Sequence, residues 1–496
     1  MPIEINLKIQ DFICVAPAAL LFLWSLVPLT FKVVRGNKEL NSMAALLLTL
    51  VGVVCSVAAS GLLYAQQSEP YFAFSNALVF DGVSVLSAIV IAIITAAAAI
   101  MAREHKATNG EHFSEFLFLL MNAAVGMMIL SWANDLIVTF IAIEIMSLCL
   151  YLLIALSKEG ALSKEAAFKY FVLGSFASAI FLYGIAFIYG ITGTTYLNVI
   201  AKSAPTLIAG NYLFMFGVLL AVLGFCFKAA IVPFHAWTPD VYEGSPIPVT
   251  AFMAAGVKFV VFVAFLRFIR GNYLSFDVSG EFITVLQWLA VLTMCLGNIA
   301  AIVQSSLKRM LAYSSIAHGG FVLIGVIAAA IGGESWRGDL SVLYYVVSYT
   351  VMTIGAFGIV CMLEKNEGDI ILVEDLRGLA KRSQITALIF TIFMLSLAGI
   401  PPLVGFFAKF FIFSAALKQG LFWLVIWAAI NSVIAAYYYL RPIVMMYMSD
   451  DAGVDVAEQY KMTRTLTTVM AMLVVLLGFA TEPFYQHIRH AISSLF

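Results

Sequence analysis

The chain contains a close succession of apolar segments, each about as long as a helix that crosses a membrane. Such a helix needs about 20 predominantly apolar residues. The sequence predicts about 14 spans, at approximately residues 12–31, 43–65, 78–102, 115–132, 134–156, 165–191, 207–231, 248–269, 281–303, 312–332, 339–363, 384–414, 421–446 and 464–481. We therefore expect an all-α polytopic membrane protein with no water-soluble domain between its spans.

The composition agrees with this class of protein. Hydrophobic residues make up 63% of the 496 residues and charged residues 11%, whereas a soluble domain carries about 25% charged residues. The net charge of −1 provides no basic field that would attract nucleic acid. The N-terminal stretch has no basic region, so we expect no cleaved signal peptide.

Motifs for metals and cofactors are absent from the sequence. The six cysteines lie in apolar stretches, and no two are spaced as a CxxC pair, which does not support iron–sulfur ligation. HExxH, GxGxxG and GxxxxGK patterns do not occur either. The sequence therefore predicts no metal and no cofactor in this chain.

The placement of lysine and arginine predicts the orientation, because cytoplasmic loops carry an excess of these residues. Sixteen basic residues are assigned to connections after odd-numbered spans. Seven are assigned to the opposite side, namely Lys8, Lys202, Arg267, Arg270, Arg337, Lys418 and Arg489. We therefore expect both termini on the outer side. The remaining lysines lie inside spans: Lys169, Lys228, Lys258 and Lys409.

Two of these lysines flank a helix break in the segment 213–258. Pro233 follows Lys228 by five residues, and proline disturbs a helix because it lacks an amide N–H and clashes with the preceding turn. Lys258 lies in the next apolar run. A charge at membrane depth costs about 2.5–3.5 kcal/mol even on the lenient insertion scale. The pattern predicts a path for ions or protons, and the alternative is a fixed ion pair or a contact with a neighbouring subunit.

Glu144 lies near the middle of the fifth span, and Ser147 and Tyr151 share its helix face. A carboxylate at this depth must be paired, neutral or hydrated. Burial favours the neutral form of a lysine, whereas a nearby carboxylate favours the charged form. A pair such as Glu144 and Lys228 is therefore a switch, whose weakening sends a proton toward Lys258. Water must bridge the carriers, because packed helices stand about 8–10 Å apart.

A second break precedes Lys409 in the twelfth span. Gly399, Pro401, Pro402 and Gly405 interrupt that span, so we expect a new helical N-terminus, with about half a positive charge, close to Lys409. The seventh and twelfth spans are five apart, which is typical of inverted repeats with discontinuous helices near the membrane midplane.

This spacing predicts four parts of the chain. Residues 1–114 form helices 1–3, and residues 115–270 form a first inverted repeat with helices 4–8. Residues 271–447 form a second inverted repeat with helices 9–13, and residues 448–496 contain helix 14.

Three other positions leave alternatives open. His318, in the tenth span, and His235, beside Pro233, can each relay protons because imidazole titrates near neutrality, or each can be a satisfied core histidine. Lys169, near the start of the sixth span, can snorkel to the inner interface instead of carrying protons. No arginine is predicted in the core of a span, which argues against a voltage sensor.

Four stretches together resemble a known family: KYFVLGSFASAIFLYGIAFIYG (169–190), FKAAIVPFHAWTPDVYEGSPIPV (227–249), LKRMLAYSSIAHGGFVLIG (307–325) and DLRGLAKRSQITALIFTIFMLSLAGIPPLVGFFAKF (375–410). They are similar to the antiporter-like membrane subunits of proton-pumping NADH-quinone oxidoreductase, respiratory complex I. Lysine at 409 resembles subunit N (chain 2 in mitochondria) rather than subunit M. The chain also lacks the long C-terminal lateral helix of subunit L.

The resemblance implies a translocase subunit without redox chemistry of its own. It implies a proton path with Glu144 paired to Lys228, Lys258 as the central carrier and Lys409 toward the outer half, and it matches Lys169 to the family's sixth-span lysine. NADH, FMN, iron–sulfur clusters and quinone are then expected in partner subunits, and subunits M, L, K, J, A and H are the expected membrane partners. A bacterial cell inner membrane is expected, because the mitochondrial chain is usually shorter at its N-terminal end.

Two other functions remain open at this point. A component of an Mrp-type cation/proton antiporter shares the fold, but a sodium site needs clustered oxygen ligands, and Glu144 is the one acid predicted deep in a span. The other alternative is a scaffold whose lysines only pair and pack.

Overall fold

The computed structural model describes residues 8–36, 38–66, 69–156, 161–271, 280–332, 337–364, 370–450 and 453–493. Within these ranges, 13 helices are long and apolar enough to cross a membrane. The shorter helices α16 (Gln384–Ala398) and α17 (Val404–Lys418) together occupy the remaining predicted span. The all-α prediction is confirmed, with a two-stranded antiparallel hairpin, β1 (Tyr71–Ala73) and β2 (Leu78–Phe80), between the second and third helices.

The helices follow the predicted spans in order. The first half of the chain contains α1 (Ile9–Val34), α2 (Ser42–Gln66), α3 (Gly82–Glu104), α4 (Phe113–Trp132), α5 (Leu136–Ala155), α6 (Ala161–Thr192), α7 (Leu197–Gly210), α8 (Tyr212–Ala229), α9 (Trp237–Gly244), α10 (Ile247–Phe252), the π-helical turn η1 (Met253–Val257) and α11 (Lys258–Gly271). The second half contains α12 (Glu281–Ile302), α13 (Leu307–Ile331), α14 (Arg337–Leu363), the 3-10 turn η2 (Val373–Leu376), α15 (Leu379–Arg382), α16, α17, α18 (Phe422–Met448), α19 (Lys461–Phe479) and α20 (Thr481–Ser493).

Both predicted helix breaks are present. Helix α8 stops before Ala230, whose φ of 59° is left-handed, and helix α16 stops before Gly399, whose φ is 88°. Glycine adopts this conformation without steric cost, whereas a residue with a Cβ rarely does. The chain then crosses a short non-helical stretch before α9 and α17 begin. The deep lysines 228 and 409 therefore lie close to free helix ends.

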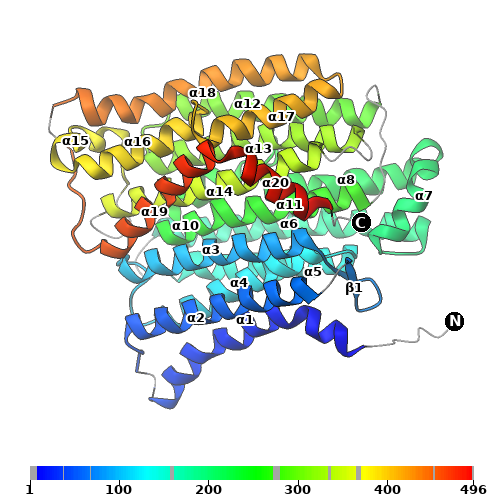
Figure 1. Cartoon of the computed structure of the whole chain (residues 1–496), viewed down its shortest axis with the longest axis horizontal. Helices are drawn as coiled ribbons and strands as arrows, with labels where there is room; N and C mark the ends of the chain where they lie inside the picture. The colour runs from blue at the N-terminus through cyan, green and yellow to red at the C-terminus, as the bar shows by residue number, and fades with distance from the viewer. Residues whose placement is uncertain are drawn as a thin grey trace.

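The central helices are wholly surrounded by protein. In Figure 1 the long helices run side by side, from α1 and α2 at the lower edge of the view to α18 at the upper edge. The membrane-spanning parts of α10–α11 and α14 are 100% buried and that of α13 is 94% buried, whereas α1, α6, α18 and α19 bury 33%. Lys258 and His318 lie on these central helices, so they are far from the apolar surroundings of the bundle.

Three features of the fold differ from the sequence-based expectation. Helix α7 is separate from α8, although the seventh span was predicted to begin at residue 207. Helix α20 follows the last span and packs against α3 and α14. The assignment of Arg267 to an outer connection is wrong, because Arg267 lies in α11 and is 1% exposed. An ion pair with Asp81 compensates its charge. The sequence did not indicate this pair, because the two residues are 186 positions apart.

Candidate functional site

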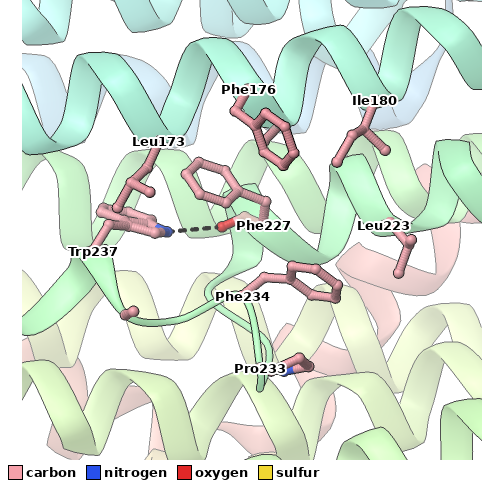
Figure 2. A pocket seen from close by; sticks show the side chains of 10 residues that line it. Leu173, Phe176, Ile180, Leu223, Phe227, Pro233, Phe234 and Trp237 are labelled. Atoms are coloured by element: carbon pink, nitrogen blue, oxygen red, sulfur yellow. Dashed lines mark hydrogen bonds between the residues drawn. The ribbon is translucent and has the colours of Figure 1, made fainter.

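Lys228 lies in the last turn of α8 and is 3% exposed. Its ammonium Nζ donates to the Ser147 hydroxyl on α5 at 2.7 Å. The indole Nε1 of Trp237, at the start of α9, donates to the Phe227 carbonyl at 3.1 Å. Figure 2 shows this bond beside an apolar pocket that α6, α8 and the break line together. The bond ties the end of α8 to α9 and so positions Lys228 at the break.

Glu144 lies one turn before Ser147 on α5, as predicted, but it makes no direct ion pair with Lys228. Its carboxylate accepts a hydrogen bond from the Ser178 hydroxyl on α6. Among the residues that the structure describes, no ion pair of 4.0 Å or less joins the two charges. Each charge therefore has its own hydroxyl partner.

Lys258 is the first residue of α11 and directly follows the π-helical turn η1. Its ammonium donates to the main-chain carbonyl of Ser315 on α13, and it lies 5.2 Å from the ring centre of Tyr349. Single π turns inside helices are rare and are frequent at functional sites. The turn contains Gly256 but no proline, and no break was predicted there from the sequence.

His318 on α13 lies between two tyrosine hydroxyls. Its Nδ1 is 2.6 Å from the Tyr345 hydroxyl on α14, and its Nε2 is 2.9 Å from the Tyr439 hydroxyl on α18. The Tyr439 hydroxyl also contacts the Ser314 hydroxyl. These contacts form a continuous hydrogen-bonded chain from Tyr345 through His318 and Tyr439 to Ser314. His318 was predicted from the sequence, whereas Tyr345 and Tyr439 were not.

Lys409 lies in the second turn of α17 and is 5% exposed. Its Nζ donates to the Ala398 carbonyl at 2.7 Å and to the Ser432 hydroxyl at 3.0 Å. Ala398 is the last residue of α16, and a helix C-terminus carries about half a negative charge. The expected new helical N-terminus is present at Val404, but the Lys409 ammonium reaches back across the break and binds the negative end of α16.

Lys169 belongs to a different environment. Its side chain is 40% exposed, and its Nζ lies 2.7 Å from both Glu165 and Asp240. Arg309 on α13 also pairs with Asp240, at 2.8 Å, and with Glu243, at 3.0 Å. The structure thus places Lys169 in a half-exposed ion-pair network that joins α6, α9 and α13, apart from Lys228, Lys258 and Lys409.

His235 lies in the break between α8 and α9 and is partly exposed. Its Nδ1 is buried and makes no hydrogen bond to the described residues. No hydrogen bond connects it with Lys228, whose ammonium contacts Ser147 instead. The break separates the two side chains, in agreement with the effect expected of Pro233.

Helix α13 contacts both Lys258 and Lys409. Ser315, His318 and Phe321 follow one another at about one-turn spacing, and they contact Lys258, the two tyrosines and Lys409, respectively. The imidazole of His318 lies within electrostatic range of both ammonium groups. In the described ranges, no group of three or more His, Cys, Asp or Glu residues could hold a metal ion. The site therefore consists of buried lysine, histidine, tyrosine and serine side chains.

Buried lysines beside two helix breaks, with a buried histidine on a central helix, define an antiporter-like membrane protein. The family model for the transmembrane region of NADH:quinone oxidoreductase and Mrp antiporters matches residues 133–435. Subunit N of the NADH-quinone oxidoreductase of Bdellovibrio bacteriovorus is 48% identical over 489 residues, which cover 99% of this chain and 100% of that protein. The chain belongs to the NADH-quinone oxidoreductase subunit N family.

Solved structures share this fold. A chain of respiratory complex I from Thermus thermophilus is 31% identical, with a TM-score of 0.77 over 93% of this chain and 96% of that chain. A chain of the Mrp complex from Dietzia sp. DQ12-45-1b has a TM-score of 0.81 over 97% of both chains at 19% identity. The second similarity is one of fold alone.

Proposed function

We propose that this chain is a proton-translocating membrane subunit of NADH-quinone oxidoreductase, which couples quinone reduction in partner subunits to proton transfer through buried side chains. One observation carries the proposal. Lys228, Lys258 and Lys409 are buried at helix irregularities, and no carboxylate among the described residues pairs directly with any of them. A lysine that is fixed in a permanent ion pair cannot release its proton easily, whereas these three can exchange theirs.

The contacts of the lysines indicate the direction in which a proton can go. The Ser147 hydroxyl and the carbonyls of Ser315 and Ala398 accept hydrogen bonds from the ammonium groups. None of these oxygens is basic enough to take the proton, so it must pass to another amine, an imidazole or a carboxylate. We infer the order Lys228, Lys258, His318 and Lys409, because the last three lie against successive residues of α13.

His318 is suited to the middle of this path. A neutral imidazole accepts a proton on one nitrogen and releases one from the other, and both nitrogens of His318 contact tyrosine hydroxyls. A positive charge on Lys258 or Lys409 disfavours a second one on His318, so the histidine passes a proton on only when a neighbouring lysine is neutral. Glu144 modulates Lys228 at the start of the path, and we assign Lys169 and His235 supporting roles near the first break.

The remaining parts of the proposal concern the assembly. NADH, FMN, iron–sulfur clusters and quinone reside in partner subunits, and the membrane neighbours are subunits M, L, K, J, A and H. The chain lies in the bacterial inner membrane with both termini on the periplasmic side. The chain contains two inverted repeats, residues 115–270 and 271–447. This assignment is supported by the helix break with a buried lysine beside it that each repeat contains.

The test uses the assembled enzyme in sealed vesicles, with proton uptake and NADH-driven quinone reduction measured together. Lys258→Ala should largely abolish both, because it removes the central carrier, while NADH oxidation by an artificial acceptor stays normal. Lys418→Ala, which changes an exposed lysine on α17, is the matched control and should behave as wild type. Full proton uptake by Lys258→Ala would remove this residue from the path and favour the scaffold alternative. Uptake driven by sodium without NADH would favour the Mrp-type function.

A further inference from the structure

Three aromatic rings surround the ammonium group of Lys228. Its Nζ lies 5.7 Å from the ring centre of Tyr170, 5.8 Å from that of Phe227 and 5.9 Å from that of Tyr151. A ring face attracts a cation at distances up to about 6 Å, most strongly where water is excluded. The rings come from α5, α6 and α8, so the packing of three helices brings them together.

The surrounding residues fix the two tyrosine rings in place. Tyr151 packs edge-on against Tyr170 with ring centres 4.8 Å apart, and Trp237 stacks on Tyr170 at 4.6 Å. A Cβ at Gly174 would overlap the Tyr151 hydroxyl, so a glycine at this point of α6 makes room for the ring. Tyr170 is 0% exposed, and its hydroxyl bonds to none of the described residues. Tyr170 therefore contributes its ring rather than its hydroxyl.

The number of rings distinguishes Lys228 from the other carriers. Among the residues that the structure describes, Lys258 has one ring near its ammonium, that of Tyr349 at 5.2 Å, and Lys409 has one, that of Phe321 at 5.0 Å. The titratable groups that face Lys228 from the elements packed around it are Glu144 and the two tyrosines, and Glu144 makes no direct ion pair with it. The rings thus provide much of the attraction that a paired carboxylate would otherwise supply.

We propose that Tyr151, Tyr170 and Phe227 form an aromatic cage that stabilises the protonated form of Lys228 and positions its ammonium against Ser147. The role of this cage in proton transfer rests on the proposed function of the chain. The cage lets the first carrier hold its proton without a direct carboxylate partner, so that a change at Glu144 can release it. Tyr170 is a positioning residue in this scheme.

The experiment measures the charge state of Lys228 directly in the purified, assembled enzyme. Trace labelling with acetic anhydride modifies only neutral amines, and mass spectrometry quantifies the label at Lys228 and at Lys258 over a range of pH. In Tyr170→Leu, labelling of Lys228 at a given pH should rise about tenfold, which corresponds to about one pH unit. Labelling of Lys258 in the same sample should not change.

Two variants separate the cage from packing effects. Tyr170→Phe keeps the ring and removes the hydroxyl, so it should label as wild type. Phe181→Leu removes a buried ring on the same helix that packs against Phe225 at 5.2 Å, and it should leave Lys228 unchanged. The proposal is overturned if Tyr170→Leu labels as wild type, if Tyr170→Phe behaves as Tyr170→Leu, or if Phe181→Leu has the same effect.

Fluorinated phenylalanines at position 170 decide the question if Tyr170→Leu does not assemble. They keep the shape of the ring, and each added fluorine weakens the electrostatic attraction between the ring face and a cation. Labelling of Lys228 should therefore rise with each added fluorine. An absence of this gradation refutes the cage. The labelling does not depend on pumping, so a failure of the proposed function, such as full proton uptake by Lys258→Ala, remains distinguishable from a failure of the cage.

Discussion

The buried ion pair between Asp81 and Arg267 allows a prediction whose size follows from the contacts. The guanidinium Nη1 and Nη2 donate to the two Asp81 carboxylate oxygens at 2.9 and 2.8 Å, and Nε donates to the Ser131 carbonyl at 2.5 Å. The two side chains are 1% and 0% exposed. Arg267 lies nine residues beyond Lys258 in α11, or about 14 Å along the helix. The pair therefore anchors the helix that carries the central lysine.

Removal of one partner leaves the other as an uncompensated buried charge, which costs about 3–5 kcal/mol. Asp81→Asn isolates this effect. Asp81 also caps α3 by accepting from the Ser84 amide at 2.8 Å, and asparagine is an equally good cap. A loss of this size is a large fraction of the about 5–15 kcal/mol that typically stabilises a folded protein. We therefore expect a marked fall in melting temperature and in the yield of assembled enzyme.

The measurement is thermal unfolding of the detergent-purified enzyme, followed through the exposure of buried cysteines to a thiol-reactive dye. The double variant Asp81→Asn/Arg267→Met should recover most of the lost stability, because it leaves no unpaired charge. Enzyme that does assemble should take up protons normally per quinone reduced, since the pair is not a carrier. An Asp81→Asn variant that melts as wild type, or a double variant as unstable as the two single losses combined, would refute this reasoning.

Three further predictions follow from the proton path and the topology. Glu144→Ala should largely abolish quinone-linked pumping and Glu144→Asp should keep a substantial part, because the charge survives at shorter reach; normal pumping by an assembled Glu144→Ala enzyme would contradict the switch. Lys409→Ala should block coupled turnover and proton uptake in vesicles, while Lys409→Glu should keep partial function, since a buried carboxylic acid can also carry a proton. If Lys409→Ala pumps fully, this residue is not on the path. A reporter fused after Phe496 should read as external and one inserted near Lys381 as cytoplasmic, and the reverse pattern would contradict the proposed orientation.

The predictions from the sequence succeeded where the signal is local. Apolar runs identified the membrane-spanning helices, and Pro233 and Gly399 marked both helix breaks. The last residues of α7 were assigned to the seventh span because only Asn211 separates the apolar end of α7 from α8. The π turn before Lys258 was missed because the sequence there reads as an ordinary apolar helix.

The candidate site divides in the same way. The deep lysines and Glu144 were identifiable because charge is rare and costly within a span. Their partners were not, since Lys228 and Ser147 are 81 residues apart and His318 and Tyr439 are 121 apart. Arg267 lay near the end of a predicted span and was therefore assigned to a connection, although the fold buries it.

The sequence by itself determined that this protein is a bundle of membrane helices with four lysines inside its spans, because length, hydrophobicity and the backbone properties of proline and glycine act over a few residues. Only the tertiary structure decided what each charge meets. Lys228 contacts a hydroxyl group and three aromatic rings, and Lys409 binds the carbonyl at the end of α16. Lys169 lies in a half-exposed ion-pair network. The physical reason is that the stability of a buried charge depends on groups within a few ångströms, and helix packing brings those groups from distant parts of the chain.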